Sequence, residues 1–250
     1  MASDKSLALI TGASSGIGFE VANQLLADGT FHVLLGVRSN EKGQAALAEL
    51  QSRNLPGTVE LLQLDVADES SVAAAAKLDA LVNNAAIAGS EGTTAQQMVE
   101  CFRVSAVGAQ LTGDYFAPLL KKAKETPRIV NVTSGAGSIS NRMDPDGYGN
   151  HTQVIPYRVS KTAMNMVFAC QHRGFEGDGF KVFLYGPGPT VSNLTPSNMG
   201  LDMKPTSVAL RRLLRWCKER GTPTRGRIRN MDGARSPGKV CAGDARFDVM

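Results

Sequence analysis

The sequence is poor in the residues that build disulfide frameworks and metal centres. Of its 250 residues only four are cysteine, none of them in CxxC spacing, and only three are histidine. A secreted disulfide scaffold needs densely paired cysteines, and a zinc site needs clustered cysteine or histidine ligands. The histidines are scattered along the chain, at His32, His151 and His172. We therefore expect a protein of a reducing compartment that holds no metal.

Long apolar runs are also missing from the sequence. No stretch approaches the ~20 apolar residues that a membrane-spanning helix needs. The first six residues, MASDKS, are polar and do not resemble the apolar core of a signal peptide. From these absences we expect a cytoplasmic protein that does not associate with a membrane.

Charge is unevenly distributed between the body of the chain and its tail. Residues 1–200 contain 15 Lys or Arg against 18 Asp or Glu, a net charge of −3, whereas residues 201–250 contain 12 against 5, a net charge of +7. The spacing of residues 207–220 indicates a basic amphipathic helix, and the composition beyond Gly221 favours disorder. The tail is either a basic appendage or the product of a shifted reading frame. It lacks the interleaved aromatic residues of single-strand binders, so we do not expect nucleic-acid binding.

The body of the chain alternates short apolar runs with helical periodicity. Strands are expected at residues 7–11, 31–37, 58–66, 79–85, 128–134 and 180–186. Helices are expected at 16–29, 40–53, 68–77 and 94–122, and a further helix begins near residue 157. The strands read as apolar on both faces, which is typical of a parallel sheet covered by helices on both sides. The sequence predicts a single α/β domain over residues 5–200, a Rossmann-like, doubly wound parallel sheet.

A glycine-rich turn lies between the first expected strand and the first expected helix. The stretch TGASSGIG places Gly12, Gly16 and Gly18 where a dinucleotide pyrophosphate approaches the backbone at a helix N-terminus. The second strand then ends in Val37 and Arg38, where an acidic residue would be expected for free ribose hydroxyls. An arginine suits a 2′-phosphate instead, because a guanidinium donates bidentate hydrogen bonds. These residues predict NADP(H), with Ser14 as an additional donor; the alternative for Arg38 is a solvated charge.

The segment YRVSK contains the residue pair with the strongest chemical signal. On a helix, Tyr157 and Lys161 stand at i and i+4 and share a face. An ammonium beside a phenol favours the phenolate and lowers its pKa, so the phenol can act as a general acid or base. The alternative is an ordinary solvated pair on a helix surface.

Taken together, six motifs in order resemble the short-chain dehydrogenase/reductase family, smaller type. They are TGASSGIG, LDV, NNAA, NVTS, YRVSK and PGPTVS, and they cover roughly residues 5–195. The resemblance implies an NADP-dependent oxidoreductase in which Tyr157 protonates the carbonyl oxygen and Lys161 lowers the Tyr157 pKa and holds the nicotinamide ribose. It further implies that Ser134 orients the substrate carbonyl, with Thr133 or Ser138 as the alternative.

The same resemblance implies the remaining cofactor contacts and a substrate class. The expected cofactor-binding residues are Gly12, Ser14, Ser15, Gly16, Ile17, Gly18, Arg38, Asp65, Val66, Asn83, Ala85, Tyr157, Lys161, Pro187, Gly188, Thr190 and Ser192. Residues 138–156 are expected to border the substrate as a mobile lid. The substrate is expected to be a small carbonyl or alcohol, and a narrower likeness to fungal secondary-metabolism ketoreductases implies a polyketide-type ketone. A homodimer is expected through the long helices, with Phe102, Val104, Leu111 and Phe116 as interface or core residues.

Three features depart from the family pattern. Ser105 stands where the family usually has a catalytic asparagine that helps to hold a water near the lysine. The expected helix at 68–77 lacks about nine residues of a usual crossover. After Ser207 the likeness stops. The alternative function is therefore a protein that binds the cofactor but is catalytically weak or inactive.

Overall fold

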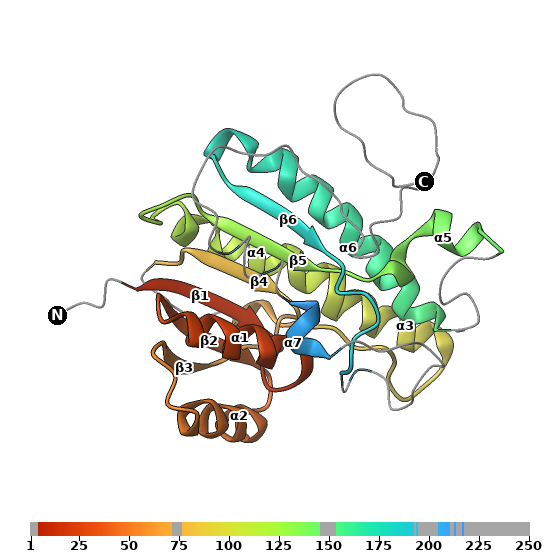
Figure 1. Cartoon of the computed structure of the whole chain (residues 1–250). Helices are drawn as coiled ribbons and strands as arrows, with labels where there is room; N and C mark the ends of the chain where they lie inside the picture. The colour runs from red at the N-terminus through yellow and green to blue at the C-terminus, as the bar shows by residue number, and fades with distance from the viewer. Residues whose placement is uncertain are drawn as a thin grey trace.

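Six parallel strands form one sheet, with strand order β3-β2-β1-β4-β5-β6 (Figure 1). A computed structural model describes residues 5–71, 77–145, 154–192, 194, 205–210, 213 and 217 of the chain. The strands are β1 (Ser6–Thr11), β2 (Phe31–Val37), β3 (Thr58–Gln63), β4 (Ala80–Asn83), β5 (Arg128–Val132) and β6 (Lys181–Tyr185). The order reverses between β1 and β4, and in such sheets ligands bind outside the carboxyl ends of the strands at that point. The predicted doubly wound α/β fold is confirmed.

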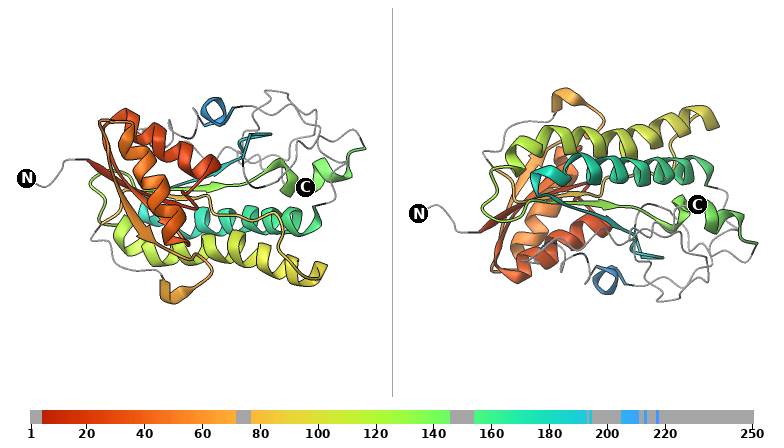
Figure 2. Two further views of the ribbon diagram at one scale, coloured as in Figure 1. Left: turned by 90° about the horizontal axis from the view of Figure 1, so that it is seen from below. Right: turned by 90° about the horizontal axis from the view of Figure 1, so that it is seen from above.

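Helices cover both faces of the sheet (Figure 2). They are α1 (Gly16–Asp28), α2 (Asn40–Ser52), α3 (Thr94–Phe102), α4 (Gly108–Leu120), α5 (Ile139–Met143), α6 (Ile155–Gly174) and α7 (Thr206–Ala209). Short 3-10 turns lie at Glu69–Ser71, Gly135–Gly137 and Glu176–Asp178. The helices α1, α2 and α7 lie on one face, and α3, α4 and α6 lie on the other.

Side chains alternate between two hydrophobic clusters along each central strand. In β1, Ala8 and Ile10 belong to the cluster under α1, whereas Leu9 packs with Phe116 and Phe168 of the opposite face. This alternation follows from the two-residue period of a strand. It explains why the central strands read as apolar on both faces.

The helix boundaries differ in detail from the sequence-based expectations. The α2 helix begins at Asn40 as expected, and Ser39 caps it: the Ser39 hydroxyl accepts a hydrogen bond from the Lys42 N–H. The expected long helix at 94–122 contains a π-helical segment at Arg103–Val107, between α3 and α4. At the position of the expected helix 68–77 the structure has the 3-10 turn Glu69–Ser71, and residues 72–76 lie outside the described part of the chain.

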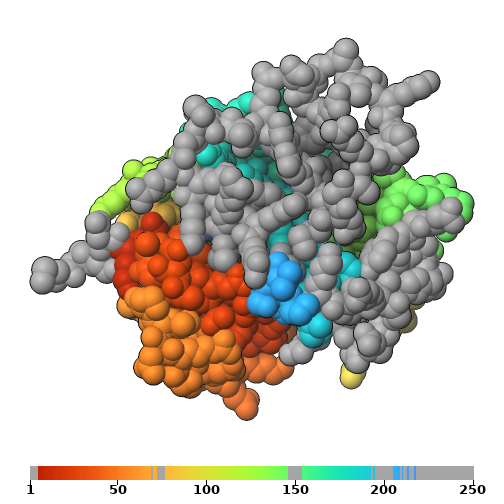
Figure 3. Space-filling model, in the orientation of Figure 1, coloured from red at the N-terminus to blue at the C-terminus, as the bar shows by residue number. Residues whose placement is uncertain are grey.

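Part of the basic tail packs against the domain. Leu210, Leu213 and Cys217 are buried in the cluster beneath α1, at a spacing that places them on one side of a helix. The side-chain amide of Gln24 on α1 donates to the carbonyl of Ser207 at 3.1 Å. Figure 3 shows this segment, in blue, against the surface next to α1. Most of the predicted helix 207–220 and all of the tail beyond it lie outside the described residues.

Candidate active site

The turn between β1 and α1 has the backbone geometry of a phosphate cradle. Gly12 and Gly16 have positive φ angles of 65° and 56°, which glycine adopts without steric cost. A Cβ atom on Gly12 would lie 2.9 Å from the Cα of Ala85, and one on Gly18 would lie 2.5 Å from the side-chain nitrogen of Asn84. At both positions a larger residue would displace the segment that follows β4.

The N-terminus of α1 opens onto this turn. Ser15 is the N-cap residue, but its side chain makes no hydrogen bond to the helix, and the first turn contains no acidic residue. The backbone N–H groups and the partial positive charge of the helix therefore remain available to an anion. Ser14 is half-buried and Ser15 exposed in the turn, while Ile17 packs partly buried against the core. This arrangement fits the pyrophosphate of a dinucleotide.

Thr11 and Asn84 hold the cradle in place, and neither was singled out from the sequence. The hydroxyl oxygen of Thr11 accepts hydrogen bonds from the backbone N–H groups of Asn84 and Ala85, both at 3.0 Å. The Asn84 amide donates to the carbonyls of Thr11 at 2.9 Å and Gly12 at 3.2 Å. The second asparagine of the NNAA segment could have indicated this role in the sequence, because only a short amide at a strand end reaches two successive carbonyls.

Asn83 is buried in a network of amides rather than exposed at the sheet edge. It donates to Asn131 at 2.9 Å and accepts from the Thr112 hydroxyl at 2.7 Å. Asn131 donates to Gln171 at 2.9 Å, and Gln171 donates to the carbonyl of Ala109 at 2.8 Å. The network connects β4, β5, α4 and α6, so Asn83 braces the sheet from inside, and its contact with the cofactor stays a prediction.

The other residues predicted at the adenosine end of the cofactor lie at the ends of β2 and β3. Arg38 is exposed directly after β2, while Val37 is buried. Asp65 is half-buried in the turn after β3, where its carboxylate accepts from the Ala67 N–H at 3.0 Å. Val66 is buried beside it and lines the pocket described below, together with Ala85.

Tyr157 and Lys161 lie on α6 next to the loop that follows β5. The ammonium nitrogen of Lys161 is 5.8 Å from the centre of the Tyr157 ring and donates to the carbonyl of Val132 at 2.8 Å. The same nitrogen lies 3.4 Å from the sulfur of Met164. Lys161 is only 2% exposed, and burial lowers its pKa to about 7.

Burial raises the pKa of Tyr157 above its ordinary value. A hydrogen bond with Ser134 opposes this effect, and the nearby Cys101 adds to it. The sequence-based expectation that Lys161 lowers the Tyr157 pKa is not met in the cofactor-free structure, because the lysine is buried against a carbonyl and a sulfur and is itself largely deprotonated above pH 7. Tyr157 is therefore a protonated phenol at neutral pH.

Three hydroxyl groups follow β5, and they point to different partners. Ser134 hydrogen-bonds Tyr157 and accepts from the Ala136 N–H at 3.2 Å. Thr133 donates to Asn165 at 2.6 Å, and Ser138 caps α5 by accepting from the Asn141 N–H at 3.1 Å. Of the candidates for orienting a carbonyl, Ser134 is the one brought to Tyr157.

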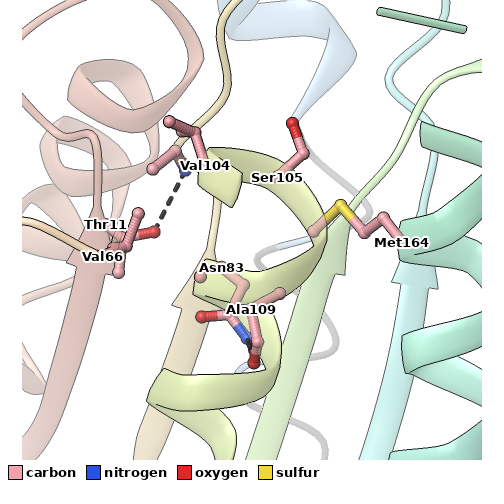
Figure 4. A pocket seen from close by; sticks show the side chains of 9 residues that line it. Thr11, Val66, Asn83, Val104, Ser105, Ala109 and Met164 are labelled. Carbon is pink, nitrogen blue, oxygen red and sulfur yellow. Dashed lines mark hydrogen bonds between the residues drawn. The ribbon is translucent and has the colours of Figure 1, made fainter. Parts of the chain in front are cut away.

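Ser105 lies in the π-helical segment and is fully buried. Its hydroxyl oxygen lies 3.4 Å from that of Ser160, and Ser160 donates its one hydrogen to the carbonyl of Tyr157 at 2.8 Å. Figure 4 shows Ser105 on the π-helical segment at a small hollow, with Thr11 and Val66 on one side of this segment and Met164 of α6 on the other. This hollow has no room for a water molecule in its interior, and it is lined by Thr11, Val66, Asn83, Ala85, Val104, Ser105, Gly108, Ala109 and Met164. π-Helical turns are frequent at functional sites.

The segment after β6 forms a hydrogen-bonded turn at the carboxyl end of the sheet. Gly188 has a φ angle of 73°, and the Thr190 hydroxyl donates to its carbonyl at 3.1 Å and to that of Pro187 at 3.3 Å. Thr190 is buried, and Ser192 accepts from the Leu194 N–H at 3.4 Å. This hydrogen-bonded turn follows the carboxyl end of β6, the end at which the Ser134 loop follows the neighbouring β5. Of the predicted lid, residues 146–153 lie outside the described part of the chain.

No described helix is long and apolar enough to cross a membrane. Among the residues that the structure describes, no cluster of three His, Cys, Asp or Glu side chains has the proximity that a metal ion requires.

Comparison with known proteins identifies relatives over most of the chain. The family model for short chain dehydrogenases matches residues 6–200. The short-chain dehydrogenase/reductase tropE of Talaromyces stipitatus is 34% identical over 81% of this chain and 85% of its own length. The short-chain dehydrogenase anuI of Penicillium roqueforti is 35% identical over 74% of this chain and 78% of its own length. The NADPH-bound carbonyl reductase from chicken fatty liver superposes with a TM-score of 0.71 at 26% identity, covering 86% of this chain and 92% of that one.

Proposed function

This chain belongs to the short-chain dehydrogenase/reductase family, and we propose that it is an NADP(H)-dependent oxidoreductase that reduces a ketone, or oxidises the corresponding alcohol, of a small organic molecule. The observation that carries the proposal is the placement of Tyr157 and Lys161 on one face of α6, against the loop that follows β5 and carries Ser134. The glycine cradle between β1 and α1 supplies the matching dinucleotide site.

Each residue of the site has a separate role in carbonyl reduction. A bound nicotinamide supplies the hydride. Ser134 orients the carbonyl by donating a hydrogen bond to its oxygen, and Tyr157 donates the proton as negative charge develops there. Because burial raises the Tyr157 pKa, the phenol is in its protonated form at neutral pH and is ready to donate. Lys161 and Ser105 act on the same proton transfer, Lys161 through an amine beside the phenol that carries a positive charge only below about pH 7, and Ser105 through its hydroxyl in the π-helical turn.

The remaining predicted residues hold the cofactor in this proposal. Ser14, Ser15, Ile17 and the three glycines bind the pyrophosphate, and Asp65, Val66, Asn83 and Ala85 border the adenosine. Pro187, Gly188, Thr190 and Ser192 border the nicotinamide. The position of each residue at the carboxyl end of the sheet supports this assignment.

Arg38 supports NADP(H) over NAD(H). Its side chain is exposed at the end of β2, where a guanidinium is able to pair with a 2′-phosphate. We expect NADPH to raise the melting temperature more than NADH at equal concentration; a ligand at 100 times its Kd stabilises by about 2.7 kcal/mol. Arg38→Asp is expected to reverse the preference, and Lys122→Asp, at an exposed position after α4, serves as the charge control. Equal shifts with both cofactors in the wild type would contradict this assignment.

The substrate we propose is an apolar ketone of polyketide type. Ile139 and Met143 on α5, Ile155 at the start of α6 and Val191 after β6 are large apolar side chains that remain exposed near the carboxyl end of the sheet. An apolar rim of this kind favours a substrate with a large hydrophobic surface.

The experiment that tests the proposed function is NADPH consumption with a panel of cyclic and aromatic ketones. We expect turnover in the wild type and a loss of about 10²–10⁴-fold in kcat for Ser134→Ala and Tyr157→Phe, with NADPH binding retained. Turnover that is unaffected by Tyr157→Phe would refute the assigned chemistry.

A catalytically weak, cofactor-binding protein is the second candidate, and Ser105 favours it. The Ser105 side chain is shorter than the asparagine of the family pattern, and its hydroxyl is engaged by Ser160. Under this alternative Ser105→Asn raises kcat at unchanged NADPH affinity. A decrease in kcat for Ser105→Asn indicates instead that the serine is the residue suited to this site.

We also propose that the chain forms a homodimer through α3 and α6. Val99 and Phe102 on α3 and Val159 and Met166 on α6 are exposed apolar side chains on two helices that lie side by side (Figure 2). Of the residues predicted from the sequence, Phe116 is fully buried in the core and does not take part. Sedimentation of the wild type and of Phe102→Asp tests this: a monomeric wild type contradicts the proposal.

A further inference from the structure

Asn165 stands on α6 one turn beyond Lys161. Residues 157, 161 and 165 follow i, i+4, i+8 spacing, so the three side chains emerge on one face of the helix. This face lies against the loop that follows β5 and carries Ser134. Asn165 is half-buried at that junction.

Both the oxygen and the nitrogen of the Asn165 side-chain amide form hydrogen bonds, and their partners lie on either side of Ser134 in the sequence. The side-chain oxygen accepts a hydrogen bond from the Thr133 hydroxyl at 2.6 Å. The side-chain nitrogen donates to the carbonyl of Gly137 at 3.3 Å. Thr133 directly precedes Ser134, and Gly137 ends the 3-10 turn that follows it. One side chain therefore spans the segment that holds the serine hydroxyl.

A second contact brings the same segment against α6. The Thr162 hydroxyl donates to the carbonyl of Gly137 at 3.0 Å. Gly137 lies so close to the helix that an added Cβ atom would be 2.7 Å from the carbonyl carbon of Lys161. The loop thus has no room to move toward the helix, and the hydrogen bonds of Asn165 and Thr162 oppose its movement away.

We propose that Asn165 is a positioning residue of the reaction, which fixes Ser134 relative to Tyr157 and Lys161 by holding Thr133 and Gly137. This inference rests on the proposed function, since Ser134 and Tyr157 are the groups that act on the substrate there. Asn165 itself touches neither reacting atom: it acts through the two backbone segments on either side of the serine.

The first test compares Asn165→Leu with the wild type in steady-state ketone reduction. We expect kcat to fall by roughly ten- to a hundred-fold, because misplacement of an orienting group by about 1 Å costs that much. The KM for NADPH is expected to stay within about two-fold, since the cradle between β1 and α1 is untouched. Cys170→Ser, an exposed substitution further along α6, is the matched control and is expected to leave kcat unchanged.

A double-mutant cycle separates positioning from a general loss of stability. Thr133→Val removes the hydroxyl that Asn165 accepts from and keeps the shape of the side chain. If the two residues act through one contact, the double variant Thr133→Val with Asn165→Leu has a kcat close to that of Asn165→Leu alone. Multiplicative losses in kcat would overturn the coupling. If Asn165→Leu does not fold, the kcat of Thr133→Val alone still tests the contact, because this variant removes the same hydrogen bond.

The second readout needs no turnover, so it distinguishes failure of this inference from failure of the proposed function. The Tyr157 phenol is titrated by NMR of ¹³C-labelled tyrosine, with Tyr157→Phe to assign the signal. The hydrogen bond with Ser134 lowers the Tyr157 pKa. Releasing the serine in Asn165→Leu is therefore expected to move the titration to higher pH. An unchanged Tyr157 titration together with an unchanged kcat would overturn the inference, whereas a shifted titration in a protein that reduces no ketone would leave the inference standing and reject the reaction.

Discussion

Lys161 is buried to an unusual degree for a lysine. Its ammonium nitrogen contacts the Val132 carbonyl and the Met164 sulfur, and these neighbours do not replace the hydration of a full charge. Burial therefore lowers the Lys161 pKa to about 7, from an ordinary value of 10.5. In the cofactor-free protein a modest change in pH around neutrality changes the charge next to Tyr157.

This pKa predicts how the stability of the cofactor-free protein depends on pH. Between pH 7 and 10.5 the unfolded chain keeps the Lys161 proton and the folded chain releases it. The unfolded state then binds more protons, so the free energy of unfolding rises with pH across this window, by at most about 1.4 kcal/mol per pH unit. Below pH 7 the contribution of Lys161 is constant and unfavourable.

Urea unfolding of the wild type and of Lys161→Met between pH 6 and pH 10 measures the effect. We expect the difference in unfolding free energy between the two proteins to shrink as the pH rises. A difference that is independent of pH would mean that Lys161 keeps its ordinary pKa in the fold.

At the scale of the elements, a buried network of side-chain amides connects the sheet to both long helices of one face. Hydrogen bonds connect Asn83 on β4 to Asn131 on β5, and Asn131 to Gln171 on α6. Gln171 in turn donates to the Ala109 carbonyl, just after the π-helical segment. Gly113 accommodates this contact, because a Cβ atom there would lie 2.4 Å from the Gln171 amide nitrogen. The network therefore holds α4 near the turn that carries Ser105.

Removing one member leaves buried polar partners without a hydrogen bond. We expect Gln171→Leu to lower the free energy of unfolding by about 1–3 kcal/mol, the cost of leaving buried polar groups unsatisfied. Gln110→Leu is the control, because Gln110 bonds Asp114 on the exposed surface of α4. Chemical denaturation of both variants makes the comparison; equal losses would show that the buried network contributes nothing beyond a surface contact.

The order of elements could be read from the sequence, but their junctions could not. Periodicity located the sheet, and the glycine turn was placed correctly before α1. The π-helical segment at Arg103–Val107 has no local signature, since its residues suit a regular helix and the extra residue in the turn depends on packing against β4 and α6. For the same reason the burial of Lys161 and the use of Asn84 and Asn165 as clamps became visible only in the folded chain.

At the scale of the whole molecule, the start of the basic tail is part of the hydrophobic core. Leu210, Leu213 and Cys217 are buried beneath α1. The charged residues around them in the sequence had led us to place this region outside the domain. Three apolar residues on one side of a helix are sufficient to dock it when the facing surface is apolar. The domain therefore extends beyond Ser207, where the sequence likeness ends.

Truncating one of these side chains tests that packing. We expect Leu213→Ala to lower the free energy of unfolding by about 2–5 kcal/mol, as for other buried leucines. Val208→Ala, at an exposed position of α7, is expected to change it by less than about 0.5 kcal/mol. Thermal or urea unfolding of the full chain distinguishes the two. A neutral Leu213→Ala would show that the tail does not belong to the folded unit.

The most direct measurement of the central claim is the transfer of deuterium from NADPH labelled at its hydride position to a ketone. The wild type is predicted to give an alcohol that carries the label, detected by mass spectrometry, and Tyr157→Phe is predicted to give at least about a hundred-fold less labelled product while still binding NADPH. Binding of NADPH with no label in any product from a broad panel of apolar ketones would contradict the account.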